Sequence, residues 1–313
     1  MANSPPFTIT IGVLALQGAF NEHIQLLRSA SQILATKSKT QDPSYQTHDF
    51  DIKYNFIEVR NETELNSCDA LIIPGGESTA ISLVAQRSGL LEPLRDFVKL
   101  HRHPTWGTCA GLILLAESAN RTKAGGQELI GGLDVRVNRN HFGRQVESFS
   151  ADLDLPFLSS LNPSTTSSSP PNSPLHPNRE NKPTPSTPSS SAPHRRKLLP
   201  TSPAPNPRIP HPSTIIAPSR PIHPTSTPNP STILAAPEIL ATLPGRTATL
   251  PTSPSTENLN LNPETGDIVA VRQANVFGTS FHPELTGDAR IHAWWLEQVI
   301  DEVVARRQMQ SSS

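Results

Sequence analysis

Thr105-Trp-Gly-Thr-Cys-Ala-Gly-Leu-Ile-Leu-Leu-Ala116 is the stretch on which the interpretation of this sequence depends. It contains a G-x-C-x-G pattern centred on Cys109, between a short hydrophobic run and an apolar segment with helical character. A strand that turns abruptly into a helix can hold its turn residue in a strained conformation, and flanking glycines are needed because a Cβ there would clash. The N–H groups at a helix start favour a thiolate over a thiol. The pattern alone fits a reactive cysteine and a structural cysteine equally well.

Strands and helices are predicted to alternate along the chain before and after this stretch. Nearly continuous apolar runs at 9–16, 54–59 and 69–74 predict strands buried on both faces of a parallel sheet. Helical spacing predicts helices at 22–34, 90–100 and 112–116. This order favours an α/β fold with a mostly parallel sheet covered by helices on both faces, whose ligands bind outside the carboxyl ends of the strands.

The second half of the chain adds further elements to this α/β domain. Alternating patterns at 133–137 and 146–153 predict two half-exposed strands that pair with each other. Strands are predicted weakly near 233–234 and clearly at 268–272 and 276–281, and a last helix at 288–305.

A proline-rich block interrupts the domain. Of the 33 prolines, 20 lie between Asn162 and Thr232, in a stretch of Pro, Ser, Thr and Asn without an aromatic residue. Such a block buries too little apolar surface to offset its ordering entropy, so we expect it to be disordered. The predicted organisation is one α/β domain in two parts, 1–161 and 233–307, with a disordered insertion at 162–232 and a disordered tail at 308–313.

Composition argues against several classes of function. The net charge of −1 provides no field that would attract nucleic acid, and the basic run 194–197 is interpreted as solvated charge rather than as a targeting signal. The two cysteines form no disulfide framework, so a reducing, cytoplasmic location is expected, with Cys68 as a small buried side chain. The N-terminus lacks the pattern of a signal peptide, and no apolar segment is long enough to span a membrane.

Two further motifs fall at predicted strand ends. Gly75-Gly-Glu-Ser-Thr79 follows the third strand and is interpreted either as a turn whose N–H groups face a ligand or as a tight turn with a Ser/Thr helix cap. His282-Pro-Glu284 follows the last strand, where the histidine and the carboxylate project to the same side. One imidazole nitrogen could then face Cys109 while the other donates to Glu284, which is the arrangement of triad enzymes.

Acyl transfer from an amide or ester is the chemistry that these parts favour. The N–H of Ala110 and an N–H of the Gly75-Gly76 turn are candidates for stabilising the tetrahedral oxyanion. No group of Cys, His and Asp has metal-ligand spacing, and the sequence contains no P-loop and no dinucleotide fingerprint, so neither a metal nor a cofactor is expected.

Five segments carry a family resemblance: 13–19 (Val-Leu-Ala-Leu-Gln-Gly-Ala), 74–79, 107–112, 139–145 (Arg-Asn-His-Phe-Gly-Arg-Gln) and 280–286. Together they resemble the glutaminase subunits of pyridoxal 5′-phosphate synthase, which are class I glutamine amidotransferases with a flavodoxin-like fold. The resemblance covers both ends of the chain and excludes the proline-rich block. G-x-C-x-G and His-Pro-Glu occur in many amidotransferases, whereas the Leu-Gln-Gly-Ala and Phe-Gly-Arg-Gln segments are specific to this family.

The resemblance implies an activity and a partner. Cys109 would attack the carboxamide of L-glutamine, with His282 as the base and Glu284 orienting it. The γ-glutamyl thioester would then be hydrolysed, and ammonia would pass to a separate synthase subunit of a hetero-oligomer that makes pyridoxal 5′-phosphate (vitamin B6).

The same resemblance implies where glutamine binds. The implied contacts are Gly76, Glu77, Ser78 and Arg139, of which Arg139 suits the substrate carboxylate. The family normally has a Phe-Ile-Arg-Ala-Pro strand whose arginine also binds glutamine. The nearest match here is 233–237, which places Leu234 and Ala235 at this contact, with alanine where arginine is expected.

Two other interpretations remain open from the sequence. A cysteine hydrolase of the DJ-1-like type also places its cysteine at such an elbow, although His282-Pro-Glu284 argues against it. A non-catalytic regulator that only binds the synthase is favoured by Ala235 and the long insertion, whereas the intact Cys109, His282 and Glu284 oppose it.

Overall fold

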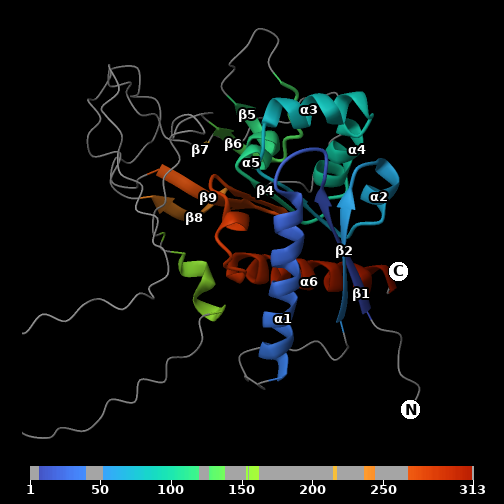
Figure 1. Cartoon of the computed structure of the whole chain (residues 1–313), viewed down its shortest axis with the longest axis vertical. Coiled ribbons are helices and arrows are strands. Elements are labelled where there is room, and N and C mark those ends of the chain that lie inside the picture. The colour runs from blue at the N-terminus through green and yellow to red at the C-terminus, as the bar shows by residue number, and fades with distance from the viewer. Residues whose placement is uncertain are drawn as a thin grey trace, which may run out of the picture. The chain divides into compact units, whose positions relative to one another are not determined.

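The computed structural model describes residues 7–39, 52–119, 127–137, 153, 155–161, 214–216, 236–243 and 267–311. The chain divides into two units, one formed by Met1–Leu161 and Ile209–Ser313 and the other by Asn162–Arg208, and every described residue belongs to the first. In this first unit, helices pack against a mixed sheet (Figure 1).

The main sheet has a parallel centre and an antiparallel edge. In the described part of the chain it contains seven strands in the order β2-β1-β3-β4-β10-β9-β8. Neighbours from β2 to β10 pair in parallel, whereas β9 and β8 are antiparallel additions. The predicted α/β class with a mostly parallel sheet is therefore confirmed. The strands are β1 Phe7–Leu14, β2 Ile52–Val59, β3 Ala70–Ile73, β4 Thr105–Thr108, β8 Glu238–Leu243, β9 Asp267–Gln273 and β10 Val276–Thr279.

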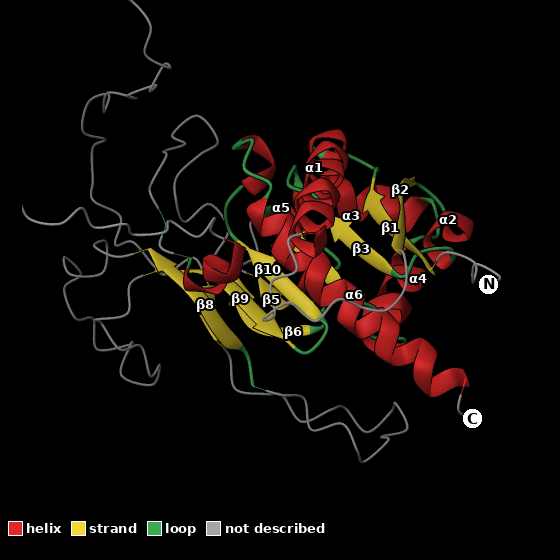
Figure 2. Ribbon diagram, turned by 90° about the horizontal axis from the view of Figure 1, so that it is seen from below, coloured by secondary structure: helices red, strands yellow, loops and turns green. Residues whose placement is uncertain are grey.

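Helices cover both faces of this sheet (Figure 2). One face carries α1 (Phe20–Lys39) and α6 (Arg290–Ser311); the other carries α2 (Glu62–Asn66), α3 (Ser78–Arg87), α4 (Leu91–Arg95) and α5 (Ala110–Leu115). Strand β3 shows why its sequence is continuously apolar: Ala70 and Ile72 pack into the core under α1 and α6, and Leu71 and Ile73 into the opposite core. Successive strand side chains point to opposite faces, so both sets are buried.

A smaller sheet combines β5 (Ala116–Ala119), β6 (Leu133–Val137) and β7 (Thr214–Ile216). Strand β6 was predicted, but its predicted partner at 146–153 lies almost entirely outside the described residues. The partners in the structure are β5, in parallel, and β7, antiparallel. Strand β7 falls inside the stretch predicted to be disordered, so that prediction does not hold for Thr214–Ile216. The composition of a block does not reveal that three of its residues pair with a distant edge strand.

The last helix is longer than the sequence indicated. We predicted it at 288–305, with a disordered tail from 308, whereas α6 continues to Ser311. Tertiary contacts anchor the extension: Arg306 donates to the carbonyl oxygens of His101 and Arg102. Arg307 pairs with Asp69 at 2.8 Å. The predicted tail is therefore helical up to Ser311.

Two deletion variants distinguish the contribution of the proline-rich insertion to stability from that of strand β7. We expect removal of residues 164–208 to leave the melting temperature almost unchanged, because their composition favours little apolar burial. Removal of 164–230 also takes away β7 and its pairing with β6. It should lower the melting temperature by roughly 2–4 °C for each kcal/mol lost. Calorimetry of both deletions checks this, and equal melting temperatures would mean that β7 contributes no stability.

Candidate active site

Cys109 stands at the tip of the turn between β4 and α5. Its φ is 47° and its ψ is −97°, and the side chain is partly exposed. A positive φ is strained for a residue with a Cβ, by roughly 1–3 kcal/mol. The turn is tight because α5 begins directly against β3: a Cβ on Gly111 would lie 2.0 Å from the carbonyl oxygen of Ile73. The strand-to-helix elbow predicted from G-x-C-x-G is therefore present.

The elbow lies beside the end of strand β10. Thr108 and Thr279 are register partners in the parallel pair β4 and β10, and the N–H of Cys109 donates to the Thr279 carbonyl oxygen at 2.8 Å. His282 follows Thr279 by three residues, so the two motifs meet at one edge of the sheet. This edge is the carboxyl edge of the parallel strands, where the sequence predicted the site.

His282 and Glu284 form a pair next to Cys109. The distance between His282 Nδ1 and Glu284 Oε1 is 2.7 Å. Hydrogen bonds from His282 to Cys109 and then to Glu284 raise the pKa of the histidine to about 10, against the opposing effect of burial. The Glu284 side chain is fully buried, whereas that of His282 is 38% exposed. At neutral pH the imidazolium therefore persists between a buried carboxylate and the partly exposed sulfur of Cys109.

The Gly75-Gly76 turn packs directly on this pair. A Cβ on Gly75 would lie 2.5 Å from His282 Nδ1, so only glycine allows the approach. The side chain of Gln17 crosses the same turn, and its Oε1 accepts the N–H of Glu77 at 2.8 Å. Gln17 belongs to the Leu-Gln-Gly-Ala segment, but the sequence analysis gave it no role. Its position shows that this segment supports the turn.

Glu77 and Ser78, two of the implied glutamine contacts, are engaged within the protein. The Glu77 carboxylate caps α3, accepting the N–H groups of Thr79 at 3.0 Å and Ala80 at 2.6 Å. The Ser78 hydroxyl is buried and donates to Gln127 Oε1 at 3.0 Å. The turn is therefore a helix cap, but the capping residue is Glu77 and not the expected Ser or Thr, because Ser78 and Thr79 already belong to α3. A contact of either residue with glutamine would therefore use main-chain atoms, or the side chain would first have to leave its present partner.

Three of the implied glutamine contacts cannot be placed. Arg139, Leu234 and Ala235 lie outside the described residues, so these assignments stay predictions. Among the described residues, no cluster of His, Cys, Asp and Glu is suited to a metal ion. Within the same part of the chain, no helix has the length and apolar character needed to cross a membrane.

Two buried histidines behind the triad were missed by the sequence analysis. His23 on α1 and His292 on α6 are both 0% exposed. Their rings pack against Trp106, with centroids 5.6 Å and 4.8 Å from its ring. Burial lowers the pKa of each histidine to about 3. Both rings are therefore neutral at physiological pH. Neither residue belongs to a motif, and the only signal was an isolated histidine near the start of each predicted helix.

These two histidines predict a loss of stability in acid. Their pKa values of about 3 lie below the 6.5 of an unperturbed histidine, so the unfolded chain binds more protons between these two values. Their contribution is complete above pH 6.5 and falls as the pH decreases toward 3, by up to about 1.4 kcal/mol per pH unit and histidine. The free energy of unfolding, measured in urea from pH 7 to pH 4.5, should depend less steeply on pH in His292→Gln than in the wild type. Equal slopes would contradict the neutral buried state of His292.

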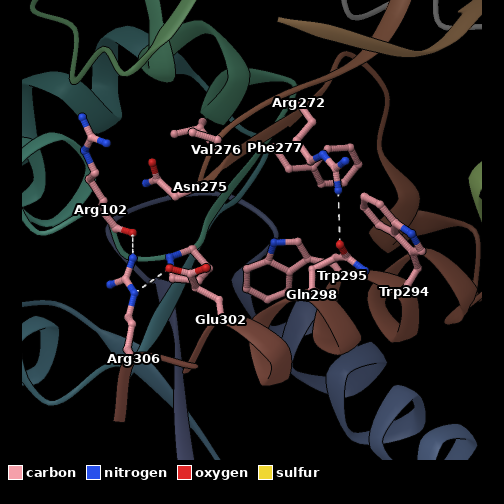
Figure 3. Close-up of a pocket in the computed structure, with 12 residues that line it drawn as sticks. Arg102, Arg272, Asn275, Val276, Phe277, Trp294, Trp295, Gln298, Glu302 and Arg306 are labelled. Carbon is pink, nitrogen blue, oxygen red and sulfur yellow. Dashed lines mark hydrogen bonds and ion pairs between the residues drawn. The ribbon is translucent and has the colours of Figure 1, made fainter. Parts of the chain in front are cut away.

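A cavity of about 360 Å³ lies at the opposite end of the parallel strands, beside their amino ends (Figure 3). Residues at the amino ends of β4 and β10, Pro104 and Val276, line it together with Trp294 and Trp295 of α6. Two of its arginines are engaged: Arg306 with Glu302 and backbone carbonyl groups, and Arg272 with Gln298. Because Cys109 and His282 lie at the carboxyl edge, this cavity is separate from the candidate active site.

Comparison with known proteins assigns the family. The model of the SNO glutamine amidotransferase family matches residues 13–168 and 230–301, both sides of the proline-rich block. The chain belongs to the SNO glutamine amidotransferase family. The matched residues include Cys109, His282 and Glu284. This agrees with the resemblance drawn from the motifs.

Relatives in this family come from plants, archaea and fungi. A probable pyridoxal 5′-phosphate synthase subunit PDX2 of Arabidopsis thaliana is 35% identical over 92% of this chain and 85% of its own length. Subunit PdxT of Thermococcus onnurineus is 29% identical over 93% of this chain and 100% of its own. Subunit SNO1 of Saccharomyces cerevisiae is 46% identical over 46% of this chain and 58% of its own length.

Proposed function

We propose that this protein hydrolyses L-glutamine to L-glutamate and ammonia, and that the ammonia passes to a synthase subunit that makes pyridoxal 5′-phosphate. The observation that carries this proposal is the His282–Glu284 pair, 2.7 Å apart, next to the Cys109 elbow at the carboxyl ends of the parallel strands. Family membership and the names of the relatives support the choice of substrate and pathway.

The first half-reaction forms a thioester. The Cys109 sulfur, as thiolate, attacks the carboxamide carbon of glutamine and forms a tetrahedral intermediate. The His282 imidazolium, held in that form by its raised pKa, gives its proton to the leaving nitrogen, and the carbon–nitrogen bond breaks. Ammonia leaves, and the γ-glutamyl group remains bound to sulfur. Glu284 keeps Nδ1 of the histidine occupied, so that Nε2 is directed to the reacting atoms.

The second half-reaction hydrolyses the thioester. His282, now neutral, accepts a proton from water as the oxygen attacks the thioester carbon. The carbon–sulfur bond breaks, glutamate is released, and the thiolate–imidazolium pair is restored. The sum is glutamine plus water giving glutamate plus ammonia.

Oxyanion stabilisation and substrate recognition complete the proposal. The N–H groups of Ala110, directly after the nucleophile, and Gly76 are the proposed oxyanion donors. Arg139 is proposed to bind the substrate carboxylate, with Gly76, Glu77 and Ser78 along the glutamine. Leu234 and Ala235 are the proposed equivalents of the family contact that contains arginine.

A reducing compartment fits the proposed role of Cys109 as the nucleophile. Cys68 and Cys109 are both free cysteines, and the nucleophile must stay reduced, outside any disulfide, to react. We therefore propose the cytoplasm as the site of action, with the synthase subunit as the partner.

The test is an assay of the purified chain with and without the synthase subunit of the same organism. Glutamate and ammonia should appear in equal amounts, with faster turnover when the subunit is present. Binding to the subunit without glutamate release would instead support a non-catalytic regulator. Hydrolysis of other esters or amides, with glutamine untouched, would support a DJ-1-like hydrolase.

A further inference from the structure

The two buried histidines lie where the fold brings two helix starts beneath the triad. Helices α1 and α6 each follow a strand of the parallel sheet, β1 and β10, and therefore begin at its carboxyl edge. His23 lies in the first turn of α1 and His292 in the first turn of α6. The candidate mechanism uses neither residue. Burying two polar rings is unfavourable unless they form hydrogen bonds, so their nitrogens need partners.

A chain of polar contacts joins these rings to Glu284. His23 Nδ1 lies 2.9 Å from His292 Nε2. His23 Nε2 lies 3.2 Å from Thr108 Oγ1 and 3.5 Å from Glu284 Oε2. The other carboxylate oxygen, Oε1, contacts His282 at 2.7 Å. Among the described residues, Glu284 Oε2 has no hydrogen bond of ordinary length. His23 Nε2 is thus placed to supply the missing donor.

The unpaired atoms determine which nitrogen carries the proton. His292 Nδ1 is buried and has no partner among the described residues. If it carried its proton, a buried donor would be left unsatisfied, and a bare lone pair of His23 would face the carboxylate. In the alternative, His292 Nε2–H donates to His23 Nδ1, and His23 Nε2–H points toward Thr108 and Glu284. Only this direction leaves no buried N–H without an acceptor.

We propose that His23 is a positioning residue of the glutaminase, donating Nε2–H to Glu284 Oε2 and thereby holding Oε1 on His282. His292 fixes the tautomer of His23 from behind. The contact of 3.5 Å is long because Nε2 is shared with Thr108. Catalytic hydrogen bonds are often long in the free enzyme and shorten in the substrate complex. The inference rests on the proposed function.

Two variants of His23 distinguish the loss of its hydrogen-bond donor from the loss of its packing in the core. His23→Met keeps an unbranched side chain in the core but removes the donor, and His23→Gln retains an N–H near the position of Nε2. With the synthase subunit present, we expect His23→Met to lower kcat roughly 10–100-fold, the range for a hydrogen bond to a charged group. The KM for glutamine should change little, and His23→Gln should retain most of the activity. His103→Met, the same substitution at the amino end of β4, should keep the wild-type kcat.

A double-mutant cycle with Glu284→Gln identifies the group through which His23 acts. If His23 works through the carboxylate, His23→Met should change kcat less than about twofold in the Glu284→Gln background. A purely structural role would lower activity by the same factor in both backgrounds, and that result would overturn the proposal. A wild-type kcat in His23→Met would also overturn it.

Nitrogen-edited NMR of the whole protein provides a measurement that does not depend on activity. We expect both His23 and His292 to be neutral with the proton on Nε2. A proton on Nδ1 of either ring would overturn the proposal even if every variant folded poorly. If the wild type released no glutamate with its synthase subunit, the proposed function would fail, whereas the tautomers would still show whether His23 donates to Glu284.

Discussion

Replacing Cys109 with alanine is expected to abolish glutamine hydrolysis while leaving the fold intact. Among the described residues, the Cys109 sulfur is the nucleophile that combines partial exposure, an elbow position and a place beside the His282–Glu284 pair. Loss of a triad nucleophile lowers kcat by roughly 10⁶-fold. Alanine has the same Cβ as cysteine, so the strained φ of 47° is neither relieved nor worsened. Glutamate release should fall to the background rate, with an unchanged urea unfolding curve.

Cys68→Ala is the matched control. Cys68 is 5% exposed, and its Sγ donates to the Glu64 carbonyl oxygen at 3.2 Å. Burial raises the pKa of this thiol to about 12, so it remains protonated. Its replacement should reduce stability slightly and leave kcat close to that of the wild type. Ammonia release by Cys109→Ala at the wild-type rate, or loss of ammonia release in Cys68→Ala, would contradict the assignment of Cys109 as the nucleophile.

His282→Ala is expected to have the second largest effect. It removes general acid–base help, worth roughly 10²–10⁴-fold in kcat. Glu284→Gln should cost less, because an amide oxygen can still accept the His282 Nδ1–H, and the glutamate orients the ring without transferring protons itself. Steady-state kcat and KM, measured with the synthase subunit, give the comparison.

The order of the two effects tests the assigned roles. A Glu284→Gln enzyme more impaired than His282→Ala would contradict a purely orienting glutamate. Because Glu284 is fully buried, unfolding curves are needed to separate lost activity from lost stability. Thr286→Ser is a suitable control near the same turn, since it keeps the hydroxyl that donates to the Pro283 carbonyl oxygen at 2.8 Å.

The sequence determined the fold class and the two ends of the candidate triad. Continuous apolar runs can be buried only between two helical layers, which is how β1 and β3 are found. The glycines on both sides of Cys109 indicated an elbow, because a Cβ at either flanking position would clash with the backbone. Local pattern was sufficient in these cases, since the physical requirement lies within a few residues of the motif.

Tertiary structure alone decided the surroundings of the triad. His23 and His292 are 269 residues apart and meet because α1 and α6 begin at the same sheet edge. The pairing of β7 with β6 and the extension of α6 to Ser311 depend likewise on distant partners. A single sequence records the spacing of residues along the chain, whereas burial and the direction of a proton depend on which chain segments pack together. The sequence therefore identified the candidate reacting side chains, and the fold brought together the buried groups that surround them.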